Sequence, residues 1–282
     1  MPAPSITFGS LPSGARTAIE AEIGSILRIE DVSTGLNSSL SALAHTAGGV
    51  VFLKGLRSDH RWVWTQQREA DINPYVTPIA PRLLFHVIAD GWDLVGFEAI
   101  DGHHADYSPG SPDLPKVTGA LRELSSLPCP DIELRHAEQR LAGYVADPAD
   151  AEAFAGNALL HTDWNNHNVL ITHDRAHLVD WGWATRGAAW IDPAHWIIWL
   201  IAAGHTPSEA EESVALLPAW RSAPPRAVNA FAHASANLWE EIAGFAPDDW
   251  TRSLLDATRL WQQHRNDRSR RDHCSSPPGW QG

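Results

Sequence analysis

A histidine, two aspartates and an asparagine follow one another at a spacing that suits the transfer of a phosphoryl group. Asp163 lies two residues after His161, and Asn168 lies five residues after Asp163. Asp180 begins the tripeptide Asp180-Trp181-Gly182 further along the chain. Phosphoryl transfer needs one carboxylate that orients and deprotonates the attacking hydroxyl, and separate oxygen ligands that hold Mg²⁺ on the nucleotide phosphates. We therefore expect Asp163 to act as the base, and Asn168 and Asp180 to bind the metal.

A short β-hairpin is expected to hold the base and the metal ligands close but apart. The segments Val169-Leu170-Ile171 and His177-Leu178-Val179 predict its two strands, with Asp174-Arg175 at the turn. Each match alone is weak, because loop polar residues produce His-x-Asp by chance. Together the positions reproduce the H-x-D-x-x-x-x-N spacing of a kinase catalytic loop followed by a metal-binding Asp-x-Gly, which favours the functional interpretation.

Three strands joined by a polar loop and a tight turn are predicted near the N-terminus, at residues 25–32, 40–45 and 50–54. The loop at 33–39 contains serines and one glycine, and such a loop can place backbone N–H groups over phosphates. Gly35, Asn37 and Ser38 are its candidate nucleotide-binding residues. An ordinary hairpin loop is the alternative interpretation.

Lys54 ends the third strand and is one of only two lysines in the chain. A lysine that reaches solvent from a strand end is the ordinary alternative to a phosphate-binding role. A helix predicted at 59–70, stopped by Asn73-Pro74, places Glu69 in its last turns, where the helix dipole disfavours a carboxylate. Lys54 would offset that cost. We expect a half-exposed ion pair worth about 0–1 kcal/mol, with a solvated Glu69 as the alternative.

The predicted elements change from strands to helices near residue 98. Two more strands are predicted before this point and seven helices after it, at 82–89 and 92–98, then at about 112–127, 135–145, 148–155, 193–203, 207–217, 225–245 and 247–265. We expect an α+β, protein-kinase-like fold of two lobes with the nucleotide between them. Its parts are a β-rich N-lobe at 1–97, a hinge at 98–102, a mostly helical C-lobe at 103–265 and a disordered tail at 266–282.

Composition narrows the class of protein. The 282 residues are 44% hydrophobic and 20% charged, as in ordinary globular proteins, and the net charge is −13. An acidic chain argues against a nucleic-acid partner and permits a cationic small substrate. No stretch is apolar enough for a membrane helix, the first residues do not form a secretory signal, and Cys129 and Cys274 cannot build a disulfide framework. These features predict a cytoplasmic protein without a membrane partner.

The motifs together resemble the aminoglycoside phosphotransferase family of kinase-like enzymes that phosphorylate small molecules. The resemblance spans roughly residues 25–200 and includes the segments Phe97–Gly102 and Ile191-Asp192-Pro193. It implies ATP and Mg²⁺ as cofactors, a phosphate-positioning pair of Lys54 and Glu69, and a helical C-lobe that shapes the acceptor pocket.

The resemblance also assigns further positions. Backbone around Glu98 to Ile100 would contact adenine, and His161 and Asp192 would organise the catalytic loop. Thr162 stands where family members often carry glycine, and the following Trp164–His167 segment is atypical. These departures concern the fit of the acceptor more than the chemistry.

The expected function is transfer of the γ-phosphate of ATP to a hydroxyl of a small molecule. An aminoglycoside or another antibiotic-like molecule is the preferred acceptor. A kinase of a choline-, homoserine- or sugar-like metabolite, a nucleotide-binding pseudoenzyme scaffold, and a metal-dependent hydrolase are the alternatives. Several C-lobe side chains are candidate acceptor walls and equally plausible core residues: Trp196, Trp199, Trp239, Glu240 and Glu241. His103-His104 could ligate a metal but is better explained as surface.

Overall fold

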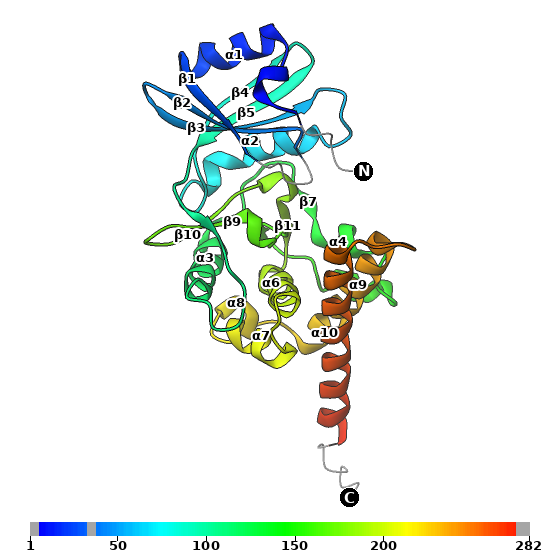
Figure 1. Cartoon of the computed structure of the whole chain (residues 1–282). Helices are drawn as coiled ribbons and strands as arrows, with labels where there is room; N and C mark the ends of the chain where they lie inside the picture. The colour runs from blue at the N-terminus through cyan, green and yellow to red at the C-terminus, as the bar shows by residue number, and fades with distance from the viewer. Residues whose placement is uncertain (1–5, 33–37, 275–282) are drawn as a thin grey trace, which may run out of the picture. The chain divides into compact units, whose positions relative to one another are not determined.

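The chain divides into two compact units in the computed structural model, which describes residues 6–32 and 38–274 (Figure 1). Unit 1 comprises residues 1–105, 130–132 and 167–184, and unit 2 comprises residues 106–129, 133–166 and 185–282. The segment 167–184 carries Asn168 and Asp180. These two residues therefore belong to the β-rich unit, although they lie in the helical half of the sequence.

An antiparallel five-stranded sheet with the order β1-β2-β3-β5-β4 forms the centre of unit 1. Its strands are β1 (Ile26–Asp31), β2 (Leu40–Thr46), β3 (Gly49–Arg57), β4 (Leu83–Ala89) and β5 (Trp92–Glu98). All five expected strands are present. Asp90 and Gly91 both have positive φ in the turn between β4 and β5, as a tight two-residue hairpin turn requires.

The two faces of this sheet bury different groups. The 3-10 helix η1 (Phe8–Ser10) and helix α1 (Ser13–Ile23) contribute Phe8, Ala15 and Ile19 to a hydrophobic core that also contains Leu53 of β3. Successive residues of a strand point to opposite faces, so Lys54 points away from this core.

Helix α2 differs from its expected position. It runs from Trp64 to Val76, so it starts later than residue 59 and continues through Pro74. Residues 58–63 form turns and a bend instead, with the N–H of His60 bonded to the carbonyl of Arg57. The Asn73 side chain bonds to the carbonyl of Pro81 and the N–H of Leu83, which ties the last turn of the helix to the start of β4.

The expected β-hairpin is present in unit 1. Strands β9 (Val169–Ile171) and β10 (Ala176–Leu178) pair antiparallel, and β6 (His103–His104) adds a third strand. The 3-10 helix η2 (Asn166–Asn168) precedes the hairpin, and η3 (Trp181–Trp183) follows it.

Unit 2 is mostly helical, as expected. Its helices are α3 (Leu114–Ser126), α4 (Ala137–Leu141), α5 (Pro148–Glu152), α6 (Ile191–Ala202), α7 (Pro207–Val214), α8 (Pro218–Arg221), α9 (Pro225–Ala243) and α10 (Asp249–Cys274). It also contains a small sheet of β7 (Arg135–His136), β11 (Thr185–Gly187) and β8 (Ala158–Leu160), in that order. The helix predicted at 135–145 was therefore wrong at its start, because residues 135–136 pair with β11 instead. No helix within residues 6–32 and 38–274 is long and apolar enough to cross a membrane.

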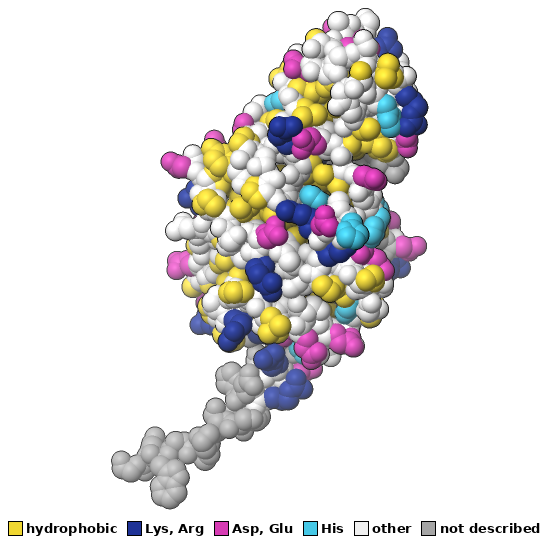
Figure 2. Space-filling view, turned by 90° about the vertical axis from the view of Figure 1, so that its left-hand side faces the viewer, with side chains coloured by type: hydrophobic (Ala, Val, Ile, Leu, Met, Phe, Trp, Pro, Cys, Tyr) yellow, Lys and Arg dark blue, Asp and Glu magenta, His cyan; other side chains and the backbone are white. Residues whose placement is uncertain are grey.

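Helix α10 is longer than expected, because the tail predicted to be disordered from residue 266 is helical through Cys274. The buried carboxylate of Glu211 in α7 accepts hydrogen bonds from Trp261, Arg265 and Arg268 of α10. Farther along, Ser269 accepts a hydrogen bond from Asn229 of α9. Figure 2 shows basic side chains gathered near the end of this helix. These tertiary contacts stabilise a polar segment whose composition alone predicts disorder.

Candidate active site

Lys54 forms two short ion pairs within unit 1. Its Nζ atom donates to Oε2 of Glu69 in α2 and to Oδ1 of Asp180 after β10, both at 2.8 Å. The side chains of Lys54 and Glu69 are only 8% and 6% exposed. The expected pairing is present in the structure, but two expectations about it were wrong. The pair is buried rather than half-exposed, and Glu69 lies in the middle of α2, so the dipole argument from the helix end does not apply.

Lys54 places a single positive charge between the carboxylates of Glu69 and Asp180. Burial opposes the charge of Lys54, but the nearby carboxylates of Asp180 and Glu69 outweigh it and raise the pKa of Lys54. Burial raises the pKa of the Glu69 carboxyl, and Lys54 counteracts that rise. Lys54 is therefore a fixed cation at neutral pH. It lies beside Asp180, whose side chain is 24% exposed.

The hairpin brings the two expected metal ligands together. Val169 pairs with Leu178, so Asn168 and Val179 follow as neighbours, and the N–H of Val179 donates to the carbonyl of Asn168 at 2.9 Å. Asp180 comes next and adopts a left-handed backbone with φ of 62°. A carboxylate and an amide oxygen are hard donors of the kind that Mg²⁺ prefers, so this pair fits the metal that the motif implies.

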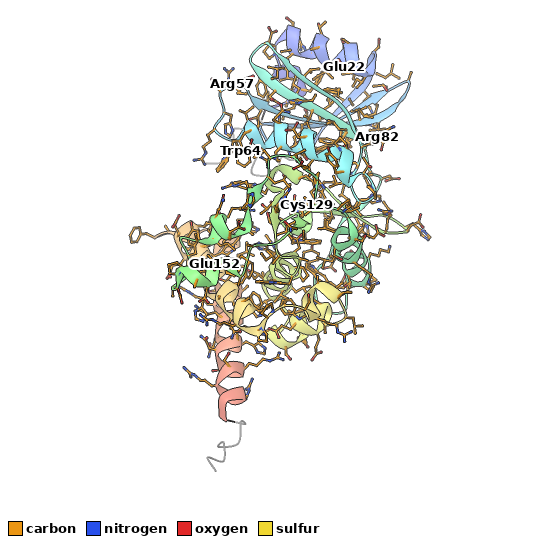
Figure 3. The ribbon with its side chains drawn as sticks, turned by 180° about the vertical axis from the view of Figure 1, so that it is seen from behind. Glu22, Arg57, Trp64, Arg82, Cys129 and Glu152 are labelled. Atoms are coloured by element: carbon orange, nitrogen blue, oxygen red, sulfur yellow. The ribbon has the colours of Figure 1, made fainter. Side chains whose placement is uncertain are left out.

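Helix α2 and η3 are packed tightly against each other. A Cβ atom on Gly182 would lie 2.7 Å from Cβ of Thr65, so only glycine allows this approach. Three indole rings contact one another beside it, with ring centroids 5.2 to 6.2 Å apart. They belong to Trp62, Trp64 and Trp183, of which Trp64 is labelled in Figure 3. This packing fixes Asp180 relative to Glu69.

The segment expected to contact adenine begins at Glu98, the last residue of β5. The N–H of Glu98 donates to the carbonyl of Arg82, and the N–H of Ala99 donates to that of Val50. Arg82, labelled in Figure 3, also forms a 2.7 Å ion pair with the Glu98 side chain. Within the described part of the chain the N–H of Ile100 has no hydrogen-bond acceptor, so it can serve a ligand.

The expected phosphate loop is only partly described. Gly35 and Asn37 lie outside the described residues, so the structure does not test them. Ser38 is buried, and the neighbouring Ser39 donates its N–H to the carbonyl of Gly55 on β3. The role of this loop in nucleotide binding stays a prediction.

The catalytic loop in unit 2 is organised by Asp192 in the first turn of α6. Its two carboxylate oxygens accept the N–H groups of His161 and Thr162, both at 2.9 Å. The N–H of Asp163 in turn donates to Nδ1 of His161 at 3.3 Å. The expected contacts of His161 and Asp192 with the loop are thus present, and they leave the Asp163 side chain half-buried.

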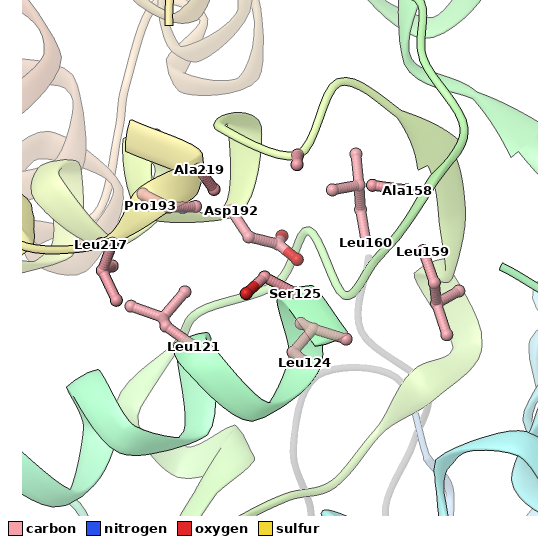
Figure 4. Close-up of a pocket in the computed structure, with 11 residues that line it drawn as sticks. Leu121, Leu124, Ser125, Ala158, Leu159, Leu160, Asp192, Pro193, Leu217 and Ala219 are labelled. Atoms are coloured by element: carbon pink, nitrogen blue, oxygen red, sulfur yellow. The ribbon is translucent and has the colours of Figure 1, made fainter. Parts of the chain in front are cut away.

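The far side of Asp192 closes a small cavity rather than a ligand pocket. Figure 4 shows the Asp192 carboxylate and Ser125 of α3 lining it together with leucines of α3 and β8. Its volume of about 10 Å³ is at the lower limit for holding one water molecule. Burial raises the pKa of Asp192, and the N–H groups that it accepts oppose this rise.

Arg140 of α4 is a residue that sequence reasoning missed. Its Nη1 atom donates to Oγ1 of Thr162 at 2.8 Å and to Oγ1 of Thr185 at 2.6 Å. Pairing of β11 with β8 and β7 brings Thr185 opposite Leu160 and next to the strand that leads into α4. No local pattern could reveal this contact, because its three residues come from separate segments.

Tyr107, whose ring packs against that of Trp196, was also not recognised as a neighbour of the base. Their rings meet edge to face at 6.1 Å, and neither Tyr107 Oη nor Trp196 Nε1 has a hydrogen-bond partner among the described residues. Burial and the negative charge of Asp163 raise the pKa of Tyr107 well above its ordinary value. The indole N–H of Trp196 opposes that rise without reaching hydrogen-bonding geometry.

The other side chains proposed as acceptor walls contact different partners. Trp199 and Trp239 both contact the half-exposed Trp250. Glu240 pairs with Arg259, and Glu241 accepts from the hydroxyl of Tyr144. Their part in acceptor binding stays a prediction.

His103 and His104 are exposed on β6, and the ring of His104 contacts that of His167 at 4.8 Å. Within residues 6–32 and 38–274 no group of three or more histidine, cysteine, aspartate or glutamate side chains is arranged to hold a metal ion.

Comparison with known proteins gives matches in structure but none in sequence. No family model matches the chain, and no curated protein sequence is detectably similar to it. The aminoglycoside phosphotransferase APH(4)-Ia matches with a TM-score of 0.61 and 13% identity over 87% of this chain and 98% of that chain. Choline kinase LicA from Streptococcus pneumoniae matches with a TM-score of 0.62 and 12% identity over 89% of this chain and 99% of that chain.

A third match is the spectinomycin phosphotransferase APH(9)-Ia in complex with ADP and spectinomycin, with a TM-score of 0.53 and 10% identity over 89% of this chain and 94% of that chain. These matches confirm the kinase-like fold, with an antiparallel N-terminal sheet and helix and a mostly helical C-terminal part. At such low identity they show the fold that aminoglycoside phosphotransferases and choline kinase share, and they do not select an acceptor.

Proposed function

We propose that this chain is an ATP- and Mg²⁺-dependent phosphotransferase that moves the γ-phosphate of ATP to a hydroxyl group of a small molecule. The observation that carries the proposal is the position of Lys54 Nζ, 2.8 Å from the carboxylates of both Glu69 and Asp180. A buried lysine held between two carboxylates is a costly arrangement for stability alone, and it matches the positioning of nucleotide phosphates by kinases.

Each polar group then has a role. Lys54 would bind phosphate oxygens while Glu69 holds its ammonium group in place. Asp180 and Asn168 would hold Mg²⁺, which supplies positive charge to the phosphates when bound. Asp163 would accept the hydrogen bond of the attacking hydroxyl and take its proton.

An aminoglycoside or another antibiotic-like acceptor is the first candidate. Support comes from matched structures that contain such compounds, namely APH(4)-Ia with hygromycin B and APH(9)-Ia with spectinomycin. The net charge of −13 also permits a cationic acceptor. A choline-like alcohol is the second candidate, because choline kinase LicA matches the fold as well as APH(4)-Ia does.

The test is an ADP-release assay with purified protein, Mg·ATP and a panel of acceptors. The panel contains hygromycin B, spectinomycin, other aminoglycosides, choline, homoserine and simple sugars, with Asp163→Asn as the matched control. We expect ADP release that depends on one class of acceptor, together with a product heavier by one phosphoryl group. Mg·ATP binding without turnover on any acceptor would support the pseudoenzyme scaffold instead.

A further inference from the structure

Thr162 has a backbone conformation that threonine rarely adopts. Its φ is 66°, in the left-handed region, where a β-branched side chain is strained. Among the described residues only two others that are not glycine have positive φ, and these are Asp90 in a hairpin turn and the metal-ligand candidate Asp180. Strain of this kind persists only where the surrounding structure enforces it, and it concentrates at functional sites.

Two hydrogen bonds hold Thr162 in this conformation, and a third fixes the Arg140 side chain that makes one of them. Its N–H is held by Oδ1 of Asp192, and its Oγ1 accepts from Nη1 of Arg140 at 2.8 Å. The same nitrogen donates to Oγ1 of Thr185 at 2.6 Å, which anchors the guanidinium to β11. A glycine would adopt this φ without strain but could not accept the hydrogen bond from Arg140.

The direction of Asp163 depends on this arrangement, because Thr162 immediately precedes it. A change in the backbone angles of Thr162 would swing the Asp163 carboxylate away from its present position. A base that is misplaced by about 1 Å can lose a hundredfold in rate.

Arg140 also lies within electrostatic reach of the base. Burial and the neighbouring Arg135 lower the pKa of Arg140 to about 10, while the charges of Asp163 and Asp192 act in the opposite direction. The guanidinium therefore stays charged at neutral pH.

We propose that Arg140, Thr162 and Thr185 form a clamp that sets the direction of Asp163, so that Arg140 is a positioning residue for phosphoryl transfer. The inference rests on the proposed function, since a clamp needs a base to position. It predicts that the hydroxyl of Thr162, rather than its size, is what catalysis requires.

The test compares Thr162→Ser, which keeps the hydroxyl, with Thr162→Val, which keeps the shape and removes it. Thr258→Val is the control, because it makes the same change at a fully buried threonine of α10. Each variant is assayed for kcat and both KM values with an acceptor that the wild type phosphorylates. Mg·ADP affinity and the melting temperature are measured beside these to establish that each variant is folded at the assay temperature.

We expect Thr162→Val to lower kcat about ten- to a hundredfold with little change in the KM for ATP. Thr162→Ser should keep most of the wild-type kcat, because it keeps the hydroxyl. Arg140→Met should lower kcat similarly. The double variant Thr162→Val/Arg140→Met should be no less active than the less active of the two single variants, because the two residues act as one unit. Thr258→Val should keep the wild-type kcat.

Folded Thr162→Val with wild-type kcat would overturn the clamp while leaving the proposed function intact. Equal loss in Thr162→Ser and Thr162→Val would overturn it as well, since the hydroxyl would then have no special role. A wild-type protein that phosphorylates no acceptor would overturn the proposed function and the clamp together.

Discussion

Lys54 and Glu69 lie fifteen residues apart in the sequence and meet in a buried ion pair with a distance of 2.8 Å from Nζ to Oε2. The first residue belongs to strand β3 and the second to helix α2, so the pair exists only when the sheet and the helix are packed together. The pair also reaches Asp180, which connects the sheet, the helix and the hairpin of unit 1 through one ammonium group.

Removing either member of this pair should affect both nucleotide use and stability. Lys54→Ala leaves a buried carboxylate without its cation, which costs about 3–5 kcal/mol when the group stays charged. We expect the lower end of this range in the free energy of unfolding, because burial already raises the pKa of Glu69 and allows it to take up a proton. Urea unfolding measures this change.

Calorimetry with Mg·ATP should show weaker binding for Lys54→Ala and a milder defect for Glu69→Ala. The variant that lacks both side chains should bind no worse than Lys54→Ala and should unfold at a higher urea concentration, because no charge is left unpaired at these two positions. Independent, additive losses of affinity would show that the two residues do not act as one unit.

Asp163→Asn should nearly abolish transfer while Mg·ATP affinity stays close to that of the wild type. The amide keeps the shape of the carboxylate but cannot take a proton, and general-base catalysis contributes about 10²–10⁴-fold in rate. Steady-state kinetics with the acceptor found in the panel measures this loss. A variant within a few-fold of the wild-type rate would remove Asp163 from the mechanism.

Asp180→Ala should instead weaken the binding of ATP in the presence of Mg²⁺, because it removes the anionic candidate ligand of the metal. The affinity for ATP should become nearly independent of Mg²⁺ concentration, and titration calorimetry at several Mg²⁺ concentrations measures this. An unchanged dependence on Mg²⁺ would contradict the role of Asp180 as a ligand.

The stability of the protein should fall as His86 loses its proton. His86 Nε2 lies 3.0 Å from Oδ1 of the buried Asp93, and this hydrogen bond raises the pKa of His86 above its ordinary value of 6.5. A raised pKa in the folded state means that the contribution is complete below pH 6.5 and is lost as the pH rises through the folded value.

We expect this contribution to be about 0.5–1.5 kcal/mol, the net worth of one hydrogen bond. The free energy of unfolding of wild type and His86→Gln, measured at about pH 5.5 and about pH 8.5, should differ more at the lower pH. A difference that is the same at both pH values would show that the proton on His86 does not stabilise the fold.

The sequence alone predicted the features that depend on neighbouring residues. Segments bounded by loop and turn residues predicted all five strands of the large sheet, and residues 169–171 and 177–179 around the turn at Asp174-Arg175 predicted the hairpin between Asn168 and Asp180. Such patterns are local, because the pleat of a strand and the reach of a hairpin involve residues close in the chain.

Tertiary packing decided the rest. The burial of Lys54 and Glu69, the extension of α10 through Cys274 and the contact of Arg140 with Thr162 each join segments that are distant in the sequence. Whether a polar side chain is solvated or buried depends on which surface lies against it, and only the packed structure determines that surface. The sequence therefore identified the candidate chemical groups, and the fold determined which of them hold the others in place.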